Sequence, residues 1–185
     1  MIEIVQKLRL KYSTDIVSNE FSTALNVEIN KFYAKQKNVD QFFHWLKKTE
    51  EKLDLNLQHM VSTFFPSLSF SITYEIDNYK DYRIHKEEIF CISFIEECYT
   101  TVYTSYIRDN KSGSVLRYRP NSMPERDSEY DDIYNRIVEE IKIKYPKKIY
   151  LENRYLNCVL GNLNLTFSRN TKTRLFEVLF RDKVY

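Results

Sequence analysis

The chain has 185 residues, with 28 basic and 26 acidic side chains, three cysteines and only two glycines. This length is enough for one domain to bury a core without disulfides or metal, and the balanced charge excludes a basic arm or an acidic tail. Two glycines are too few for a P-loop or a dinucleotide-binding loop, in which the backbone approaches phosphate closely. We therefore expect no cofactor.

The amino-terminal residues predict a cytoplasmic protein. Glu3 stands where a signal peptide carries cations, and no long apolar run follows it. No segment approaches the roughly eighteen apolar residues that a membrane span needs, so we expect no membrane association. Cys91, Cys98 and Cys158 are widely spaced and odd in number, which predicts buried thiols and not a disulfide framework or a zinc site.

Two helices are predicted before the first strand. Residues 14–35 carry apolar side chains at close to helical spacing. In residues 39–64, apolar side chains recur at steps of three and four opposite a charged face, and Pro66 ends the pattern. We expect this second helix to cover the sheet that follows it.

Residues 67–77 predict a strand with one buried face, because their side chains alternate strictly in character. The apolar positions are Leu68, Phe70, Ile72, Tyr74 and Ile76. The positions between them are small, hydroxylated or acidic, so we expect the serines, Thr73, Glu75 and Asp77 to face water.

Three more strands, at 84–96, 98–107 and 114–119, follow through short connections typical of an antiparallel meander. Residues 89–95 are apolar on both faces, which predicts a central strand. The loop at 109–113 ends in Gly113, a residue that tolerates positive φ.

A third helix is predicted from Ser128, three residues before Asp131 as in a capping box, to Tyr145. Short strands at 148–151 and 162–168 and helical turns at 171–180 follow. The fold class is then α+β, with amino-terminal helices on one face of a mainly antiparallel meander. We expect a single domain at 1–185, made of a helical part (1–66), the meander (67–119) and a helix with short strands (120–185).

No pattern predicts an active site, so we expect a protein that is not an enzyme. His44, His59 and His85 lack metal-ligand spacing, and the acidic-x-Lys matches at 50–52 and 140–142 lie on predicted helices, not on the strands used by metal-dependent nucleases. Cys91 and His85 form a nucleophile and base only if the fold brings them together.

Acidic residues gather where the third helix begins. Acids in a first turn complement the helix dipole, which is the plainer explanation, but Glu125 and Asp127 precede the helix. With the neighbouring tyrosines they predict a surface that steers and anchors a basic protein partner. Its residues are Glu125, Asp127, Glu129, Tyr130, Asp131, Asp132 and Tyr134.

The stretch 142–174 favours an alternative partner. It holds eight basic residues and one acidic residue, with Tyr145, Tyr150 and Tyr155 between them. Basic side chains contact phosphates and aromatic rings stack on bases, so this stretch is compatible with nucleic-acid binding.

In size, compartment, helix-then-meander order and acidic tyrosine-bearing surface, the chain resembles the small cytoplasmic immunity proteins with which bacteria neutralise a secreted toxin domain. These proteins share no motif. The resemblance implies a non-catalytic inhibitor that binds one cognate toxin domain. The alternatives are a nucleic-acid-binding or regulatory protein that uses 142–174, and a hydrolase whose site assembles from scattered residues.

Overall fold

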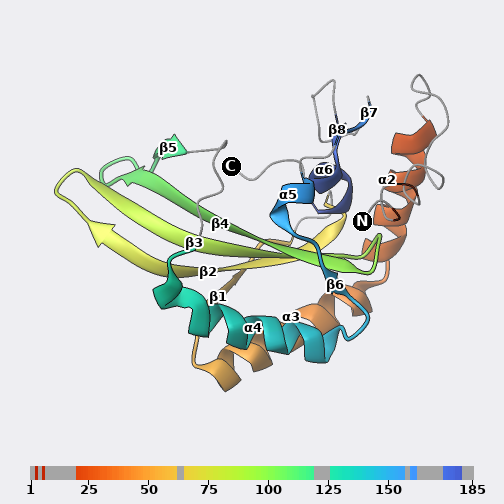
Figure 1. Cartoon of the computed structure of the whole chain (residues 1–185), viewed down its shortest axis with the longest axis horizontal. Coiled ribbons are helices and arrows are strands. Elements are labelled where there is room, and N and C mark those ends of the chain that lie inside the picture. Colours follow the sequence, from red (N-terminus) through yellow and green to blue (C-terminus); the bar gives the residue numbers. More distant parts are fainter. Residues whose placement is uncertain are drawn as a thin grey trace.

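The computed structural model describes residues 3, 6, 20–61, 65–118, 126–156, 159–161 and 173–180. Six strands form a twisted sheet in the order β1-β2-β3-β4-β5, with β6 beside β4, and helices lie on both sides of it (Figure 1). The predicted α+β class, with helices before an antiparallel meander, is confirmed. None of the described helices is both long and apolar enough to span a bilayer.

The elements of the first two thirds are α2 (Glu20–Tyr33), α3 (Gln36–Leu53), β1 (Leu57–His59), β2 (Ser67–Asn78), β3 (Tyr82–Ser93), β4 (Cys98–Asp109) and β5 (Val115–Tyr118). After them come η1 (Ser128–Tyr130), α4 (Asp131–Lys144), β6 (Ile149–Tyr150), α5 (Asn153–Leu156), β7 (Val159–Gly161), β8 (Thr173–Arg174) and α6 (Leu175–Leu179). Gly113 has φ +69°, as its loop requires.

One face of the sheet is covered by α3 and α4, which lie side by side below it in Figure 1. Phe42 and Leu46 of α3 pack on Phe70 of β2, and Ile137 and Ile141 of α4 complete this half of the core. The cover that was predicted for α3 is confirmed for this part of β2. The sheet order also places β3 between β2 and β4, so the prediction of a central strand is confirmed.

The predicted helix 39–64 is wrong at its end, because α3 stops at Leu53. Asp54 takes the left-handed conformation, with φ 54°, and its N–H bonds the Glu50 carbonyl. The Glu50 side chain then accepts a hydrogen bond from the Leu57 N–H, where β1 begins. Leu57 therefore continues the apolar spacing of the helix while lying in a strand.

The prediction for Ile76 is also wrong. A β-bulge between Thr73 and Glu75 adds one residue to β2, so the alternation of faces reverses beyond it. Ile76 then lies opposite His85, on the face away from α3, and is 44% exposed.

The expectation that the serines of β2 face water is wrong. Ser67, Ser69 and Ser71 are buried, because α2, α5 and α6 cover the second face of the sheet over the first half of β2. The Ser67 hydroxyl donates to the Phe180 carbonyl, so a small polar residue lies inside with its hydrogen bond satisfied.

Several details of the last third differ from the expectation. The capping box does not form, because Ser128 lies in the 3-10 turn η1 and Asp131 accepts from Arg126 instead. β6 pairs with β4 in parallel, and α5, β7 and β8 had no clear sequence signal. The predicted strand 162–168 lies outside the described residues.

Candidate protein-binding site at the start of α4

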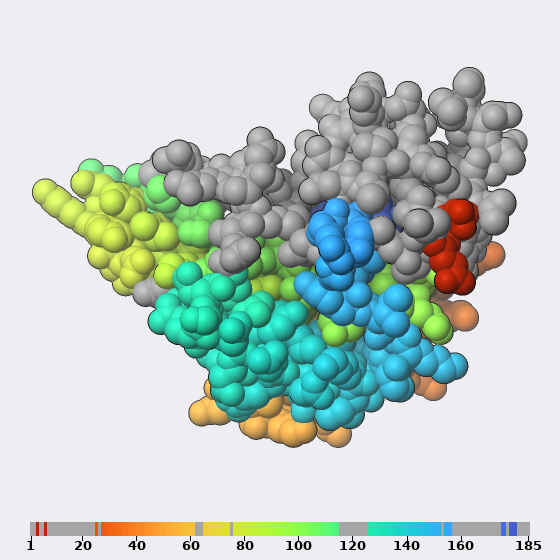
Figure 2. All heavy atoms as spheres, viewed as in Figure 1, coloured from red at the N-terminus to blue at the C-terminus, as the bar shows by residue number. Residues whose placement is uncertain are grey.

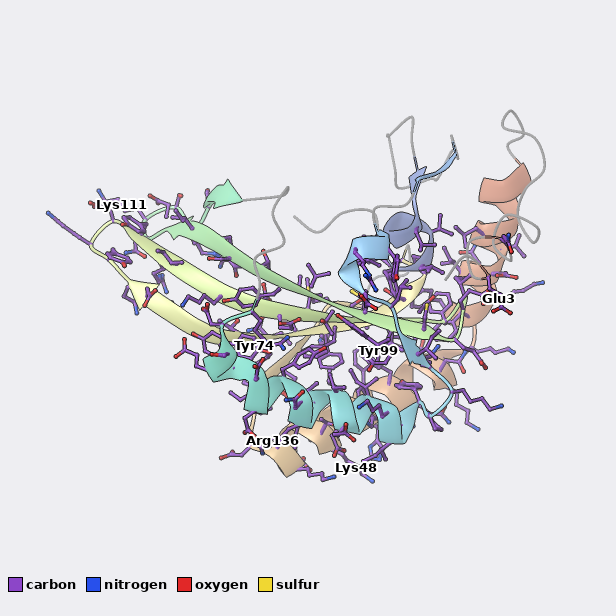
Figure 3. All side chains as sticks on the ribbon, viewed as in Figure 1. Glu3, Lys48, Tyr74, Tyr99, Lys111 and Arg136 are labelled. Carbon is purple, nitrogen blue, oxygen red and sulfur yellow. The ribbon has the colours of Figure 1, made fainter. Side chains whose placement is uncertain are left out.

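A pair of stacked tyrosines fixes the start of α4 on the sheet. Tyr130, the last residue of η1, stacks on Tyr74 of β2 with ring centroids 4.5 Å apart and planes 4° apart. Tyr130 is only 8% exposed. In Figure 3, Tyr74 and Tyr99 lie between the sheet and α4. Of the two tyrosines of the predicted surface, Tyr130 is therefore buried, and Tyr134 is partly buried against the same core.

Arg126 connects this turn to the buried face of the sheet. Its guanidinium lies 3.5 Å from the ring centroid of Tyr134 and donates twice to Asp131 Oδ1, at 3.0 and 2.8 Å. Its Nη1 also lies 3.5 Å from Oε2 of Glu88, a β3 residue that is 1% exposed. Arg126 thus holds Asp131 in one orientation, and Glu88 in turn holds Arg126 by an ion pair.

Asp127 is held by two neighbouring strands. Its Oδ2 accepts from the Tyr103 hydroxyl of β4 at 3.3 Å and from Lys86 Nζ of β3 at 3.2 Å. Burial, together with the Asp127 carboxylate, raises the pKa of Tyr103 to about 12. Tyr103 therefore stays protonated at neutral pH and acts as the donor.

Glu129 and Asp132 point outward beside these anchored acids. The Asp132 side chain is 84% exposed, and its carboxylate lies 4.0 Å from the Arg136 guanidinium. Glu129 is also exposed. We call Asp127, Glu129, Asp131 and Asp132 the acidic edge. The start of α4, coloured teal in Figure 2, lies at the surface of the face shown there. Glu125 lies outside the described residues.

Three residues that support the acidic edge escaped the sequence analysis: Lys86, Glu88 and Tyr103. Glu88 had a usable signal, because it shares a strand face with Phe90 and Ile92 and interrupts that apolar series with a charge. Burial raises the pKa of its carboxyl, and hydrogen bonding to Thr101 and the charge of Arg126 offset only part of this effect.

A cavity of about 600 Å³ lies at the other end of α4. Its apolar lining comes from Phe32 of α2, Phe42 of α3, Leu68 of β2, Ile92 of β3 and Phe94 of the β3–β4 turn. Its charged lining is balanced, with Lys144 and Lys148 from the end of α4 and the segment after it, and Glu96 and Glu97 from the β3–β4 turn. No sequence pattern marked this cavity, since its walls come from segments far apart in the chain.

The described part of the basic stretch does not form a continuous cationic surface. Lys142 pairs with Glu139 at 2.7 Å, and Arg154 pairs with Glu152 at 2.7 Å. Lys148 turns inward and donates to two backbone carbonyls, those of Ser93 and Glu96.

The fold does not bring Cys91 and His85 together. Both lie on β3 six positions apart, a separation of about 20 Å along a strand. Cys91 and Cys98 are buried, as expected, and Cys158 lies outside the described residues. Within the described ranges, no three His, Cys, Asp or Glu side chains are grouped to hold a metal ion. The acidic-x-Lys matches lie on α3 and α4, as predicted.

Comparisons with protein-family models, with curated proteins and with solved structures gave no match to this chain.

Proposed function

We propose that this chain is a non-catalytic protein-binding module of the immunity type, which neutralises a cognate toxin domain by direct binding. The observation that carries the proposal is the acidic edge, where four carboxylates lie close together at the start of α4 and two of them are held by hydrogen bonds. Asp127 and Asp131 are oriented by Lys86, Tyr103 and Arg126, while Glu129 and Asp132 extend into water.

This arrangement suits a basic partner for two physical reasons. Carboxylates that project from an exposed rim, as Glu129 and Asp132 do here, increase the rate of diffusional encounter with a cationic surface. Groups that are already oriented also lose less conformational entropy on binding than mobile side chains do. Because Tyr130 is buried and Tyr134 is partly buried, the edge contributes mainly to the association rate.

The test begins with a partner captured from the native host, which is then purified and assayed for direct binding and for neutralisation of its activity. The double variant Glu129→Lys, Asp132→Lys removes the two acids that have the fewest internal contacts. We expect its association rate at low salt to fall by about tenfold or more, while the free energy of unfolding falls by no more than about 1 kcal/mol, because Asp132 lies in the first turn of α4. The matched control Glu51→Lys, Asp81→Lys reverses two exposed acids elsewhere, so it has the same net charge as the edge variant.

Two results would count against the proposal. Equal association rates for the edge variant and the control would place the interface elsewhere. Binding without any loss of the partner's activity would reject the role as an inhibitor, while leaving a protein-binding role in place.

A further inference from the structure

The second half of β2 leaves one edge of the sheet unpaired. β1 pairs with β2 from Phe70 to Ile72, and no described element pairs with the same side of β2 from Thr73 to Asn78. This segment spans about 20 Å of strand. In Figure 1, the yellow end of β2 extends past the start of α4. A free edge of this length presents backbone donors and acceptors with which another strand can pair.

The register of β2 and β3 shows which backbone groups face the free edge. In an antiparallel pair, alternate residues direct their N–H and C=O groups toward the partner strand. The Tyr79 N–H bonds the Tyr82 carbonyl across the turn. Counting back along β2, Asp77 therefore directs its backbone groups to β3, whereas Ile76 and Asn78 direct theirs away from it. The Ile76 carbonyl accepts a hydrogen bond from the Asn78 side chain at 3.3 Å, as an outward-facing group can.

The charges along this edge favour a cationic segment over a second copy of the chain. The free segment contains two acids in its sequence, Glu75 and Asp77, and no base. Lys80 lies in the turn beyond the segment, and Lys86 of β3 is one strand further in and paired with Asp127. Two copies that paired through this edge would bring the acids of one close to those of the other, which opposes pairing.

Exposed apolar side chains lie next to the free edge. Ile76 is 44% exposed, and Tyr79, where the turn begins, is 47% exposed. Tyr79 stacks on Tyr82 at 4.6 Å, so its ring is held before any partner arrives. Asn110 fixes the turn by donating to the Tyr79 and Lys80 carbonyls, at 2.7 and 3.2 Å. A preorganised edge loses less conformational entropy on binding.

We propose that the free edge of β2, residues 73–78, binds an extended cationic segment of a protein partner, which adds to the sheet as a further strand. The backbone of this segment bonds the outward-facing groups of Ile76 and Asn78. Its side chains alternate between the two faces, so that apolar residues contact Ile76 on one face and lysine or arginine lies beside Asp77 on the other.

The added strand would lie next to the acidic edge. Asp77 pairs in register with Ile84 of β3, and Lys86, two residues further, therefore shares the face of Asp77. Lys86 holds Asp127, so the acidic edge lies on this face as well. The inference rests on the proposed function, because the cationic partner is the toxin domain proposed above, and it names how that domain pairs with this chain.

The test uses an acetylated and amidated heptapeptide in which lysine and valine alternate, with lysine at both ends. Nuclear magnetic resonance of the isotope-labelled protein follows its binding. We expect saturable shifts confined to β2 and its neighbours, with slower amide exchange at Ile76 and Asn78. The peptide with glutamate in place of lysine should not bind. The peptide with proline in place of valine keeps the charge but loses N–H groups, so its affinity should fall by about tenfold or more.

Two variants test the edge from the side of the protein. Ile76→Pro removes an N–H that faces outward, a position where an edge strand tolerates proline, and should weaken binding of the lysine peptide by about fivefold or more. The matched control Ile76→Val keeps both the N–H and a branched apolar side chain. Its affinity should change by less than about twofold.

The proposal is overturned if the lysine peptide does not bind, if the proline peptide binds as tightly, if the shifts centre on another part of the chain, or if Ile76→Pro and Ile76→Val bind alike. If Ile76→Pro does not fold, the comparison of the three peptides on the wild-type protein decides. Peptide binding at β2 without neutralisation of the captured partner rejects the inhibitor role alone. Neutralisation without peptide binding rejects the added strand alone.

Discussion

Tyr130, at the end of η1, and Tyr74, in the middle of β2, stack with their ring centroids 4.5 Å apart and join two segments far apart in the chain. Tyr130 lies between Glu129 and Asp131 in sequence, so the buried ring fixes the backbone from which two acids of the edge project. The tyrosine that was predicted to contact a partner thus supports the acidic edge from inside.

The first prediction follows from this burial. Tyr130→Ala should lower the free energy of unfolding by about 3–4 kcal/mol, because a large ring is removed from a packed site and leaves a cavity. Urea denaturation measures the change. Tyr79→Ala is the matched control: Tyr79 also stacks on a tyrosine, Tyr82, at 4.6 Å, but it is 47% exposed and should cost less than about 1 kcal/mol. Similar losses for the two variants would contradict the packing of Tyr130.

The second prediction compares two apolar residues of β2 on opposite sides of its bulge. Phe70 has no exposed surface and stacks on Phe90 at 4.9 Å, so Phe70→Ala should cost about 3–5 kcal/mol. Ile76→Ala should cost less than about 1 kcal/mol, because Ile76 is 44% exposed beyond the bulge. Denaturant unfolding of the two variants measures both. A large loss at Ile76 would mean that the alternation continues through the bulge.

The sequence predicts the strand and its helical cover well, because period-two and helical spacing are local properties. Leu68, Phe70 and Ile72 lie on the face expected for them. The bulge after Thr73 has no glycine or proline to mark it, and its consequence for Ile76 follows only from the register with β3. A pattern of alternation assigns faces only as far as the pairing stays regular.

The candidate site shows the same limit. The acids of the edge are contiguous in the sequence and could be found there. Their supports, Lys86 and Tyr103, come from β3 and β4, and only the packing of α4 on the sheet brings them to Asp127. The cavity lined by Phe32 and Lys148 depends on the meeting of α2, α3 and the end of α4, which no local pattern encodes.

The third prediction concerns the buried serine face. Ser67→Ala should cost about 1–3 kcal/mol, because the Phe180 carbonyl loses the hydroxyl that donates to it in the interior. Ser128→Ala, at an exposed position of η1, should stay within about 0.5 kcal/mol of the wild type. Thermal and urea unfolding of both variants provide the comparison. No loss at Ser67 would indicate that the contact between β2 and the end of α6 adds nothing to stability.

The last prediction uses the pH dependence of stability to test the buried carboxyl of Glu88. Because burial raises its pKa above 4.5, the native state binds this proton more tightly than the unfolded chain does. Ionising Glu88 therefore costs native stability, and the cost grows as the pH rises from about 4.5 to the folded pKa. Glu88→Gln keeps the shape and an acceptor for Arg126 but does not ionise. The variant should thus gain stability relative to the wild type as the pH rises.

The measurement is urea unfolding of both proteins at several pH values between about 4 and 8, where other titrating groups contribute equally and cancel in the difference. Glu97→Gln removes a carboxyl at an exposed position of the β3–β4 turn and is the control for the loss of one negative charge. A flat difference for Glu88→Gln would mean that Arg126 and Thr101 fully offset the burial of Glu88. A difference that falls with pH would mean that they hold its pKa below the ordinary value, and that Arg126 stabilises the start of α4 through this ion pair.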